Sequence, residues 1–169
     1  TTEFLDPAHL YMRRPLTMQS IFDASLIALT HHMRQLNEEN PVPVFETADV
    51  FFDREIPSLC GIRFTQVRSY TALQEMLNDA VETYETWFVY EEILEEAKID
   101  WVAGRSTQIG PEGKALTLAE GKTAYGSVFH YIEQYTALES STIEDFKNVF
   151  EQYIKKQTSL WILSSDTAE

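Results

Sequence analysis

The residues of this chain that could perform metal or proton chemistry are four histidines, one cysteine and many carboxylates. His31 and His32 are adjacent, and His130 stands three residues before Glu133. Helical proteins build carboxylate-bridged metal sites from Glu-x-x-His, and the order here is reversed. The sequence also contains no loop of the EF-hand type. We therefore predict no metal site, with His32 at the edge of the core and His31 exposed.

Nucleophilic catalysis has equally little support in the sequence. Cys60 lies in an apolar turn without an adjacent base, and a free cysteine usually behaves as a small buried hydrophobic residue. A single cysteine also excludes an internal disulfide framework and a multi-cysteine zinc site. The chain has no Gly-x-Ser-x-Gly motif, no complete phosphate-binding loop and no Gly-x-Gly-x-x-Gly motif. We therefore predict no catalytic residues, no cofactor and no enzymatic activity.

The strongest charge signal is an acidic stretch over residues 71–98. Nine acidic residues and one basic residue between positions 71 and 100 contribute −8 of the formal net charge of −14. Apolar residues recur at three- and four-residue steps, and Thr71 with Gln74 has the spacing of a capping box, so we expect one long helix. A kink or a change of packing partner is expected near residues 86–90, where β-branched and aromatic residues crowd. The candidate partner-binding residues are Glu75, Asp79, Glu82, Glu85, Glu92 and Glu96, together with Arg13 and Arg14.

Two interpretations of this acidic face remain open. Charge runs are usually solvated helix surfaces. However, several like charges here are three or four residues apart, and each such pair costs about 0.2–0.5 kcal/mol on a helix. A surface that faces a basic protein, or other copies of the chain, would offset that cost. Nucleic acid and anionic membranes are poor partners because basic residues are few and scattered.

The elements that must position these residues indicate an α+β fold, with three main helices packed on a small, mostly antiparallel sheet. A second capping box, Ser141 with Glu144, marks the start of the last helix. The stretch over 125–138 is compatible with either a strand or a helix. The predicted helices are 17–37, 71–98 and 142–157, and the predicted strands are 44–52, 61–67 and 160–163. A glycine-containing loop or loose hairpin with a short strand candidate covers 104–126.

The predicted domain organisation is simple. Residues 1–16 form an N-terminal arm, residues 17–163 form a single domain, and residues 164–169 form a polar tail. The arm contains two prolines and the Arg13–Arg14 pair, and we expect it to reach a neighbouring subunit. The sequence contains no apolar run of membrane-spanning length and no secretory signal, so a virion or cytoplasmic location is expected.

Two passages resemble tail-terminator or head–tail neck proteins of tailed phages. Residues 55–64, EIPSLCGIRF, resemble the family's turn into its second strand. Residues 121–135, GKTAYGSVFHYIEQY, resemble its late strand. The resemblance implies a non-enzymatic ring subunit without a cofactor.

The functional expectation follows from these observations. The sequence favours a structural or interaction protein, most plausibly an oligomeric subunit of a larger assembly such as a phage head–tail or tail-completion complex. The alternative is an acidic inhibitor, an immunity protein or a DNA mimic, that binds a basic protein through the 71–98 helix.

Overall fold

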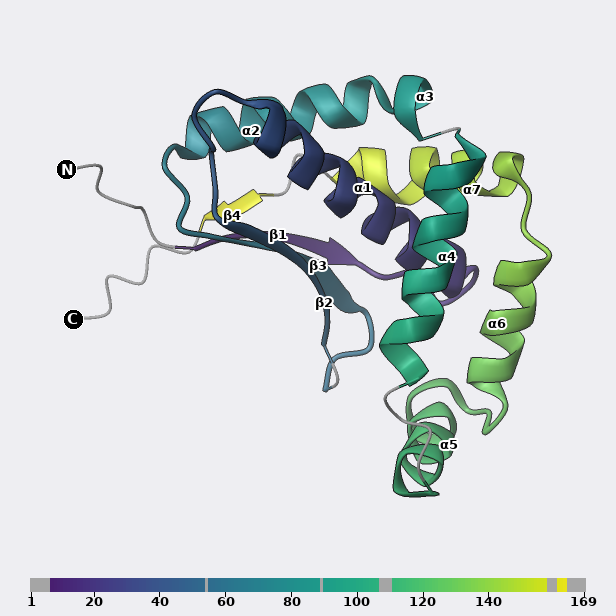
Figure 1. Cartoon of the computed structure of the whole chain (residues 1–169). Helices are drawn as coiled ribbons and strands as arrows, with labels where there is room; N and C mark the ends of the chain where they lie inside the picture. The colour runs from purple at the N-terminus through teal and green to yellow at the C-terminus, as the bar shows by residue number, and fades with distance from the viewer. Residues whose placement is uncertain (1–6, 54, 89, 107–110, 158–160, 164–169) are drawn as a thin grey trace, which may run out of the picture.

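The computed structural model describes residues 7–53, 55–88, 90–106, 111–157 and 161–163. Helices lie against one face of a sheet, so the predicted α+β class is confirmed (Figure 1). The first part of the expected arm, the expected tail and residue 160 lie outside the described residues. In chain order the elements are β1 (Ala8–Arg13), α1 (Gln19–Glu39), β2 (Thr47–Phe52), β3 (Leu59–Thr65), α2 (Tyr70–Glu82), α3 (Tyr84–Trp87), α4 (Glu91–Ser106), α5 (Pro111–Tyr125), α6 (His130–Glu139), α7 (Ile143–Val149), the π-helix η1 (Phe150–Ile154), the 3-10 helix η2 (Lys155–Gln157) and β4 (Trp161–Leu163).

The sheet has the strand order β2-β3-β1-β4, and each neighbouring pair is antiparallel. The β2–β3 ladder runs from Thr47 opposite Thr65 to Phe52 opposite Cys60, which confirms the predicted antiparallel pairing of these two segments. The short C-terminal strand was also predicted, and it pairs with β1 at the edge of the sheet.

β1 is the largest departure from the predicted N-terminal arm. Ala8, Leu10 and Met12 are buried while the residues between them are less so, which is the alternation of a strand that packs one face on a core. The strand lies inside the sheet between β3 and β4. An arm over residues 1–16 is therefore wrong for this segment, because its two prolines flank the strand and leave the N–H groups within it free to pair.

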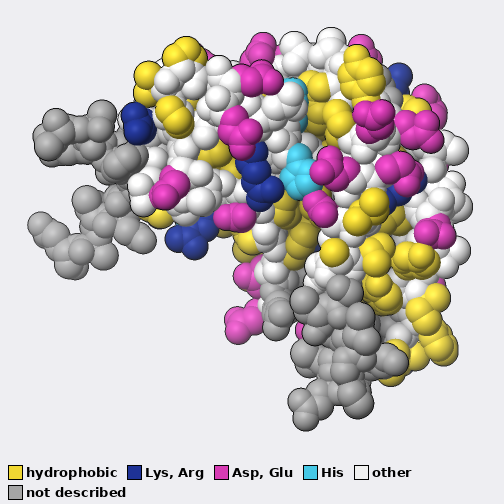
Figure 2. All heavy atoms as spheres, in the orientation of Figure 1, with side chains coloured by type: hydrophobic (Ala, Val, Ile, Leu, Met, Phe, Trp, Pro, Cys, Tyr) yellow, Lys and Arg dark blue, Asp and Glu magenta, His cyan; other side chains and the backbone are white. Residues whose placement is uncertain are grey.

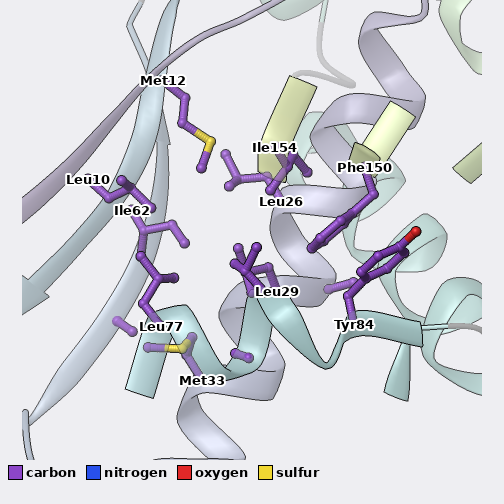
Figure 3. Close-up of a cluster of buried hydrophobic side chains, with 14 of the residues drawn as sticks. Leu10, Met12, Leu26, Leu29, Met33, Ile62, Leu77, Tyr84, Phe150 and Ile154 are labelled. Carbon is purple, nitrogen blue, oxygen red and sulfur yellow. The ribbon is translucent and has the colours of Figure 1, made fainter. Parts of the chain in front are cut away.

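The core forms where α1 meets the inner face of the sheet. Side chains of β1 and β3 point toward those of α1, and the covering helices close the cluster (Figure 3). α1 contacts β2 as well as α2, α4, α6 and α7, which explains why it is buried around most of its circumference. Its bounds confirm the helix predicted over 17–37 to within two residues. The labelled core residues are Leu10, Met12, Ile62, Leu26, Leu29, Met33, Leu77, Tyr84, Phe150 and Ile154.

The single long helix predicted over 71–98 is wrong, because the chain forms α2, α3 and α4 in its place. Side chains take over backbone acceptors at the break: Thr83 Oγ1 donates to Asp79 O at 2.7 Å, and Trp87 Nε1 donates to Ala80 O at 2.8 Å. The break turns the aromatic rings that follow it into the core, where Phe88 is fully buried. The N-cap is Ser69 rather than the predicted Thr71 capping box.

The predicted loop or loose hairpin over 104–126 is also wrong, since its described residues up to Tyr125 belong to the end of α4 and to α5. Pro111 opens α5 at a position where the missing N–H is harmless. Gly121 serves packing rather than a turn, because a Cβ added there would lie 2.5 Å from Ser127 O. The segment left open between strand and helix is helical in α6.

The last predicted helix is confirmed in extent but not in detail. α7, η1 and η2 together cover residues 143–157, so the predicted continuous helix changes its hydrogen-bonding pattern along its length. Its capping box is formed by Thr142 and Asp145, one residue after the predicted pair. Seven α-helices are therefore present among the described residues, where the sequence predicted three main ones.

Candidate binding pocket

The acidic residues predicted to bind a partner are exposed, but they are distributed over three helices instead of one helix face. Glu75, Asp79 and Glu82 belong to α2, and the others belong to α3 and α4. Arg13 is exposed at the end of β1, whereas Arg14 is 7% exposed and forms an ion pair inside the fold. A partner-binding role for these residues stays a prediction.

The two adjacent histidines of α1 have different surroundings. His31 Nε2 lies 3.0 Å from Asp100 Oδ2 on α4. His32 stacks on Trp87 with a ring separation of 4.1 Å, at the edge of the core. Burial lowers the pKa of His32 below its ordinary value because the cation would lose hydration.

A pocket of about 690 Å³ lies where the β2–β3 turn faces α4, α5 and α6. These elements occupy the same end of the molecule (Figure 1). The volume falls in the range of small-molecule sites. The residues that line it include Arg14, Gln19, Phe52, Asp53, Glu55, Trp101, Glu120, Tyr125, His130 and Tyr131.

A buried ion pair fixes the inner wall of this pocket. Arg14 Nε donates to Asp23 Oδ1 at 2.8 Å, and Arg14 Nη2 donates to Asp23 Oδ2. Trp101 Nε1 donates to the same Oδ2 at 3.1 Å, and Arg14 Nη1 donates to Tyr125 Oη at 3.0 Å. Burial alone would lower the pKa of Arg14, but the hydrogen bond and charge of Asp23 outweigh it, and the pKa lies above its ordinary value. These bonds join the end of β1 to α1, α4 and α5.

Gln19 stands beside this wall and is 2% exposed. Its Oε1 lies 2.8 Å from His130 Nε2, and the His130 ring stacks on Tyr125 at 3.8 Å. Gln19 Nε2 is buried and has no hydrogen-bond partner in the described part of the chain. A buried N–H group without a partner costs about 1–3 kcal/mol, so this atom has a reason to meet a ligand acceptor.

The pocket lining also combines aromatic rings with carboxylates. Trp101 and Tyr131 stack in parallel at 5.6 Å, and the Arg14 guanidinium lies 4.8 Å above the ring of Phe52. Glu55 in the β2–β3 turn and Glu120 on α5 also line the pocket. The pocket can therefore hold an apolar stem on its rings and a positive charge at its acidic side.

Asp53 shapes the turn at the pocket mouth. Its Oδ1 accepts from the backbone N–H groups of Glu55 and Ile56 at 2.8 and 2.7 Å. Such a carboxylate replaces backbone acceptors in a tight turn and fixes its conformation. The turn is therefore held in place beside α4 and α5 by a side chain of its own.

The sequence Gly121-Lys122-Thr123, which resembles the end of a phosphate-binding loop, lies inside α5. Its backbone N–H groups are thereby committed to a helix and are not displayed at a helix N-terminus. Thr123 Oγ1 donates to Ala119 O in the same helix. This tripeptide contributes packing and part of the pocket lining, and no phosphate cradle.

Comparison with known proteins was informative only at the level of structure. No family model and no curated protein sequence matches the chain. The inactive peptidase domain of a candidate zinc protease from Bordetella parapertussis superposes with a TM-score of 0.72 and 13% identity, covering 91% of this chain and 87% of that chain.

Two further structures show the same fold. A candidate zinc protease from Bordetella pertussis has a TM-score of 0.70 at 13% identity, covering 88% of this chain and 86% of that one. The periplasmic protease PqqL from Escherichia coli has a TM-score of 0.68 at 15% identity, covering 94% of this chain but only 20% of PqqL. The fold is therefore that of these peptidase domains, and in PqqL it makes up one part of a longer chain.

These comparisons overturn the resemblance to phage tail-terminator and neck proteins. The expected assembly subunit of a phage tail or virion and the alternative acidic inhibitor are both wrong. The structure shows why the motifs misled. Residues 55–64 are an ordinary hairpin turn leading into β3, and residues 121–135, taken as a late strand, are the end of α5 and the start of α6.

Zinc is the metal that the neighbouring structures suggest, and the described residues do not fit it. His31 contacts one carboxylate, His32 is stacked on Trp87, and His9 is stacked on Tyr11. Within the described ranges no group of three His, Cys, Asp or Glu side chains could hold a metal ion. A catalytic zinc site requires three protein ligands and an open position.

Sequence reasoning missed the residues of this pocket. Gln19, Trp101 and Tyr125 carry no recognisable motif, and contacts such as Arg14 with Tyr125 span 111 positions. Arg14 was singled out, but as a candidate partner-binding residue of an N-terminal arm. The one signal that could have placed Arg14 in the fold was the alternation of side chains along a strand, because residues 8, 10, 12 and 14 share one side of an extended chain.

None of the described helices is both long and apolar enough to cross a membrane.

Proposed function

We propose that this chain is a non-catalytic domain of the peptidase fold that binds polypeptide and works as part of a larger protease-type protein. The observation that carries this proposal is the structural likeness, over 91% of the chain, to a domain described as the inactive peptidase domain of a zinc protease candidate. The 20% coverage of PqqL supports a role as one domain among several.

The positions of the histidines support a non-catalytic role. His130 Nε2 lies 2.8 Å from Gln19 Oε1 and its ring stacks on Tyr125, while Glu133 accepts from Ser127 Oγ at 3.4 Å. The reversed His-x-x-Glu pair is therefore held in separate structural contacts. Peptide hydrolysis by zinc needs a bound and activated water, and these side chains are not arranged to supply its ligands.

Two surfaces support contact with polypeptide. The pocket offers aromatic walls, a buried donor and carboxylates, which suits a peptide side chain. On α6 and the turn before it, large apolar side chains are exposed, and hydrophobic side chains gather over this helix in Figure 2. Exposed apolar patches of this kind mark protein contacts. Phe129 and Ile132 are 60% and 57% exposed and would face a neighbouring domain.

The test separates binding from cleavage. The purified chain is mixed with fluorescein-labelled, reduced and carboxymethylated lactalbumin, with and without equimolar zinc. Anisotropy reports binding and gel electrophoresis reports cleavage. We expect saturable binding, an intact polypeptide, and no stoichiometric zinc in native mass spectrometry. Zinc-dependent cleavage that disappears in the His130→Gln or His31→Gln variant would refute the proposal.

A further inference from the structure

The charges around the pocket select its ligand. Asp53, Glu55 and Glu120 all line it. Arg14 is the one cation among its described lining residues, and Asp23 already neutralises that charge at the inner wall. Neither Glu55 nor Glu120 forms an ion pair with a described Lys or Arg. The pocket therefore presents a negative potential that favours a cation and disfavours an anion.

The polar atoms of the pocket select a peptide over a bare cation. Gln19 is 2% exposed, lines the pocket and leaves its Nε2 without an acceptor among the described residues. An amide N–H of this kind pairs with a carbonyl oxygen, the acceptor that every peptide unit supplies. A simple metal cation could not satisfy this donor, because both would compete for acceptors.

The rings of the pocket suit a long side chain with a charged end. Lys and Arg pack their methylene stems on apolar surface and keep the charged group in a polar environment. The half-buried rings of Tyr131 and Phe52 supply such a surface, with the buried ring of Trp101 stacked behind Tyr131, and aromatic faces also attract cations. The carboxylates of Glu55 and Glu120 lie on the same lining, where they can receive the charge.

We propose that the pocket between the β2–β3 turn and α4–α6 is a recognition site for an arginine or lysine side chain of a bound polypeptide. This inference rests on the proposed polypeptide-binding function and adds its side-chain specificity. The carboxylates of Glu55 and Glu120 receive the cationic group, the aromatic rings hold the stem, and Gln19 Nε2 donates to a carbonyl of the same peptide.

The experiment compares matched peptides on the full chain. Fluorescein-labelled heptapeptides carry arginine, lysine, citrulline or glutamate at the central position among alanines and glycines. Citrulline keeps the shape of arginine without its charge. We expect the arginine and lysine peptides to bind roughly tenfold more tightly than the citrulline peptide, and the glutamate peptide to bind most weakly.

Variants then assign this preference to the pocket. Glu120→Gln and Glu55→Gln should each weaken arginine binding roughly two- to fivefold and leave citrulline binding unchanged, as expected for partly exposed charge pairs. Gln19→Met should weaken all four peptides by a similar factor. Glu38→Gln, an exposed carboxylate on α1 that does not line the pocket, is the matched control and should change nothing. Circular dichroism melts confirm that each variant is folded.

The outcomes separate this inference from the proposed function. The proposed specificity is overturned if the arginine and citrulline peptides bind with equal affinity, or if arginine binding is unchanged in both Glu→Gln variants. In either case, binding of lactalbumin would still support the polypeptide-binding function. Loss of lactalbumin binding together with peptide binding would overturn both. Arginine binding that falls in the Glu120→Gln variant, with citrulline binding constant, establishes the site.

Discussion

The buried ion pair behind the pocket makes a sharp prediction about stability. Asp23 is fully buried and accepts two hydrogen bonds from Arg14 and one from Trp101. The Asp23→Ala change leaves the Arg14 charge buried without compensation, at 7% exposure. Breaking one side of a buried pair costs about 3–5 kcal/mol, so the free energy of unfolding should fall by that amount.

A double variant tests whether the uncompensated charge is the cause. Arg14→Met combined with Asp23→Leu replaces the pair by apolar side chains, which is often close to neutral. Here Trp101 Nε1 and Tyr125 Oη each lose a partner, and a lost hydrogen bond costs about 1 kcal/mol. The double variant should therefore lose about 2 kcal/mol or less, which is smaller than the loss in Asp23→Ala alone.

Urea denaturation followed by far-ultraviolet circular dichroism gives both values, with tryptophan fluorescence as a second probe of the Trp101 environment. For a domain of this size a loss of 3–5 kcal/mol corresponds to a decrease of roughly 6–20 °C in the melting temperature. A loss below 1 kcal/mol in Asp23→Ala, or a double variant less stable than the single one, would refute this reasoning.

Three further predictions concern other parts of the fold. Gly121→Ala should lower the free energy of unfolding by about 1–3 kcal/mol, because the new Cβ would meet Ser127 O at 2.5 Å. Gly104→Ala has open space around it and should raise the free energy of unfolding by up to about 1 kcal/mol in the same denaturation assay. Burial lowers the pKa of His32, so the neutral imidazole stabilises the folded state above about pH 6.5, and this stabilisation is lost as the pH falls through the folded pKa. His32→Gln should therefore flatten the dependence of the urea midpoint on pH in that window. An unchanged dependence in the variant would contradict this assignment. Burial raises the pKa of Cys60 to about 12, so iodoacetamide should label it at pH 8 only at the rate of unfolding, and rapid labelling of the native protein would contradict its buried position.

The parts of the fold that local patterns determine were predictable. α1 follows from a wide apolar stripe, and β2 and β3 follow from β-type residues around a proline turn. The break after α2 was not predictable from periodicity, because the apolar residues continue at helical spacing through it. What ends α2 is tertiary: Trp87 turns back to donate to Ala80 O, and the rings of Tyr84 and Phe150 stack at 4.5 Å.

The mistaken loop over 104–126 has a related cause. Glycine is an unfavourable residue in an isolated helix, so several glycines in one stretch favour turns. Gly121 nevertheless lies in α5, because only a residue without a Cβ lets the helix approach the backbone of Ser127. A packing requirement of this kind looks like a turn signal in the sequence and becomes clear only when the neighbouring segment is in place.

The ion pair at the inner wall of the pocket could have been predicted from the sequence by one inference. Once residues 8, 10 and 12 are taken as the buried side of a strand, residue 14 falls on the same side, and a buried arginine requires a buried carboxylate. Asp23 is the acidic residue on the buried stripe of α1, between Phe22 and Ala24. The pairing of Arg14 with Asp23 was thus within reach of pattern and charge alone. Trp101, Tyr125 and Gln19 were not, because only the packing of α4, α5 and α6 around that pair brings them to the same pocket.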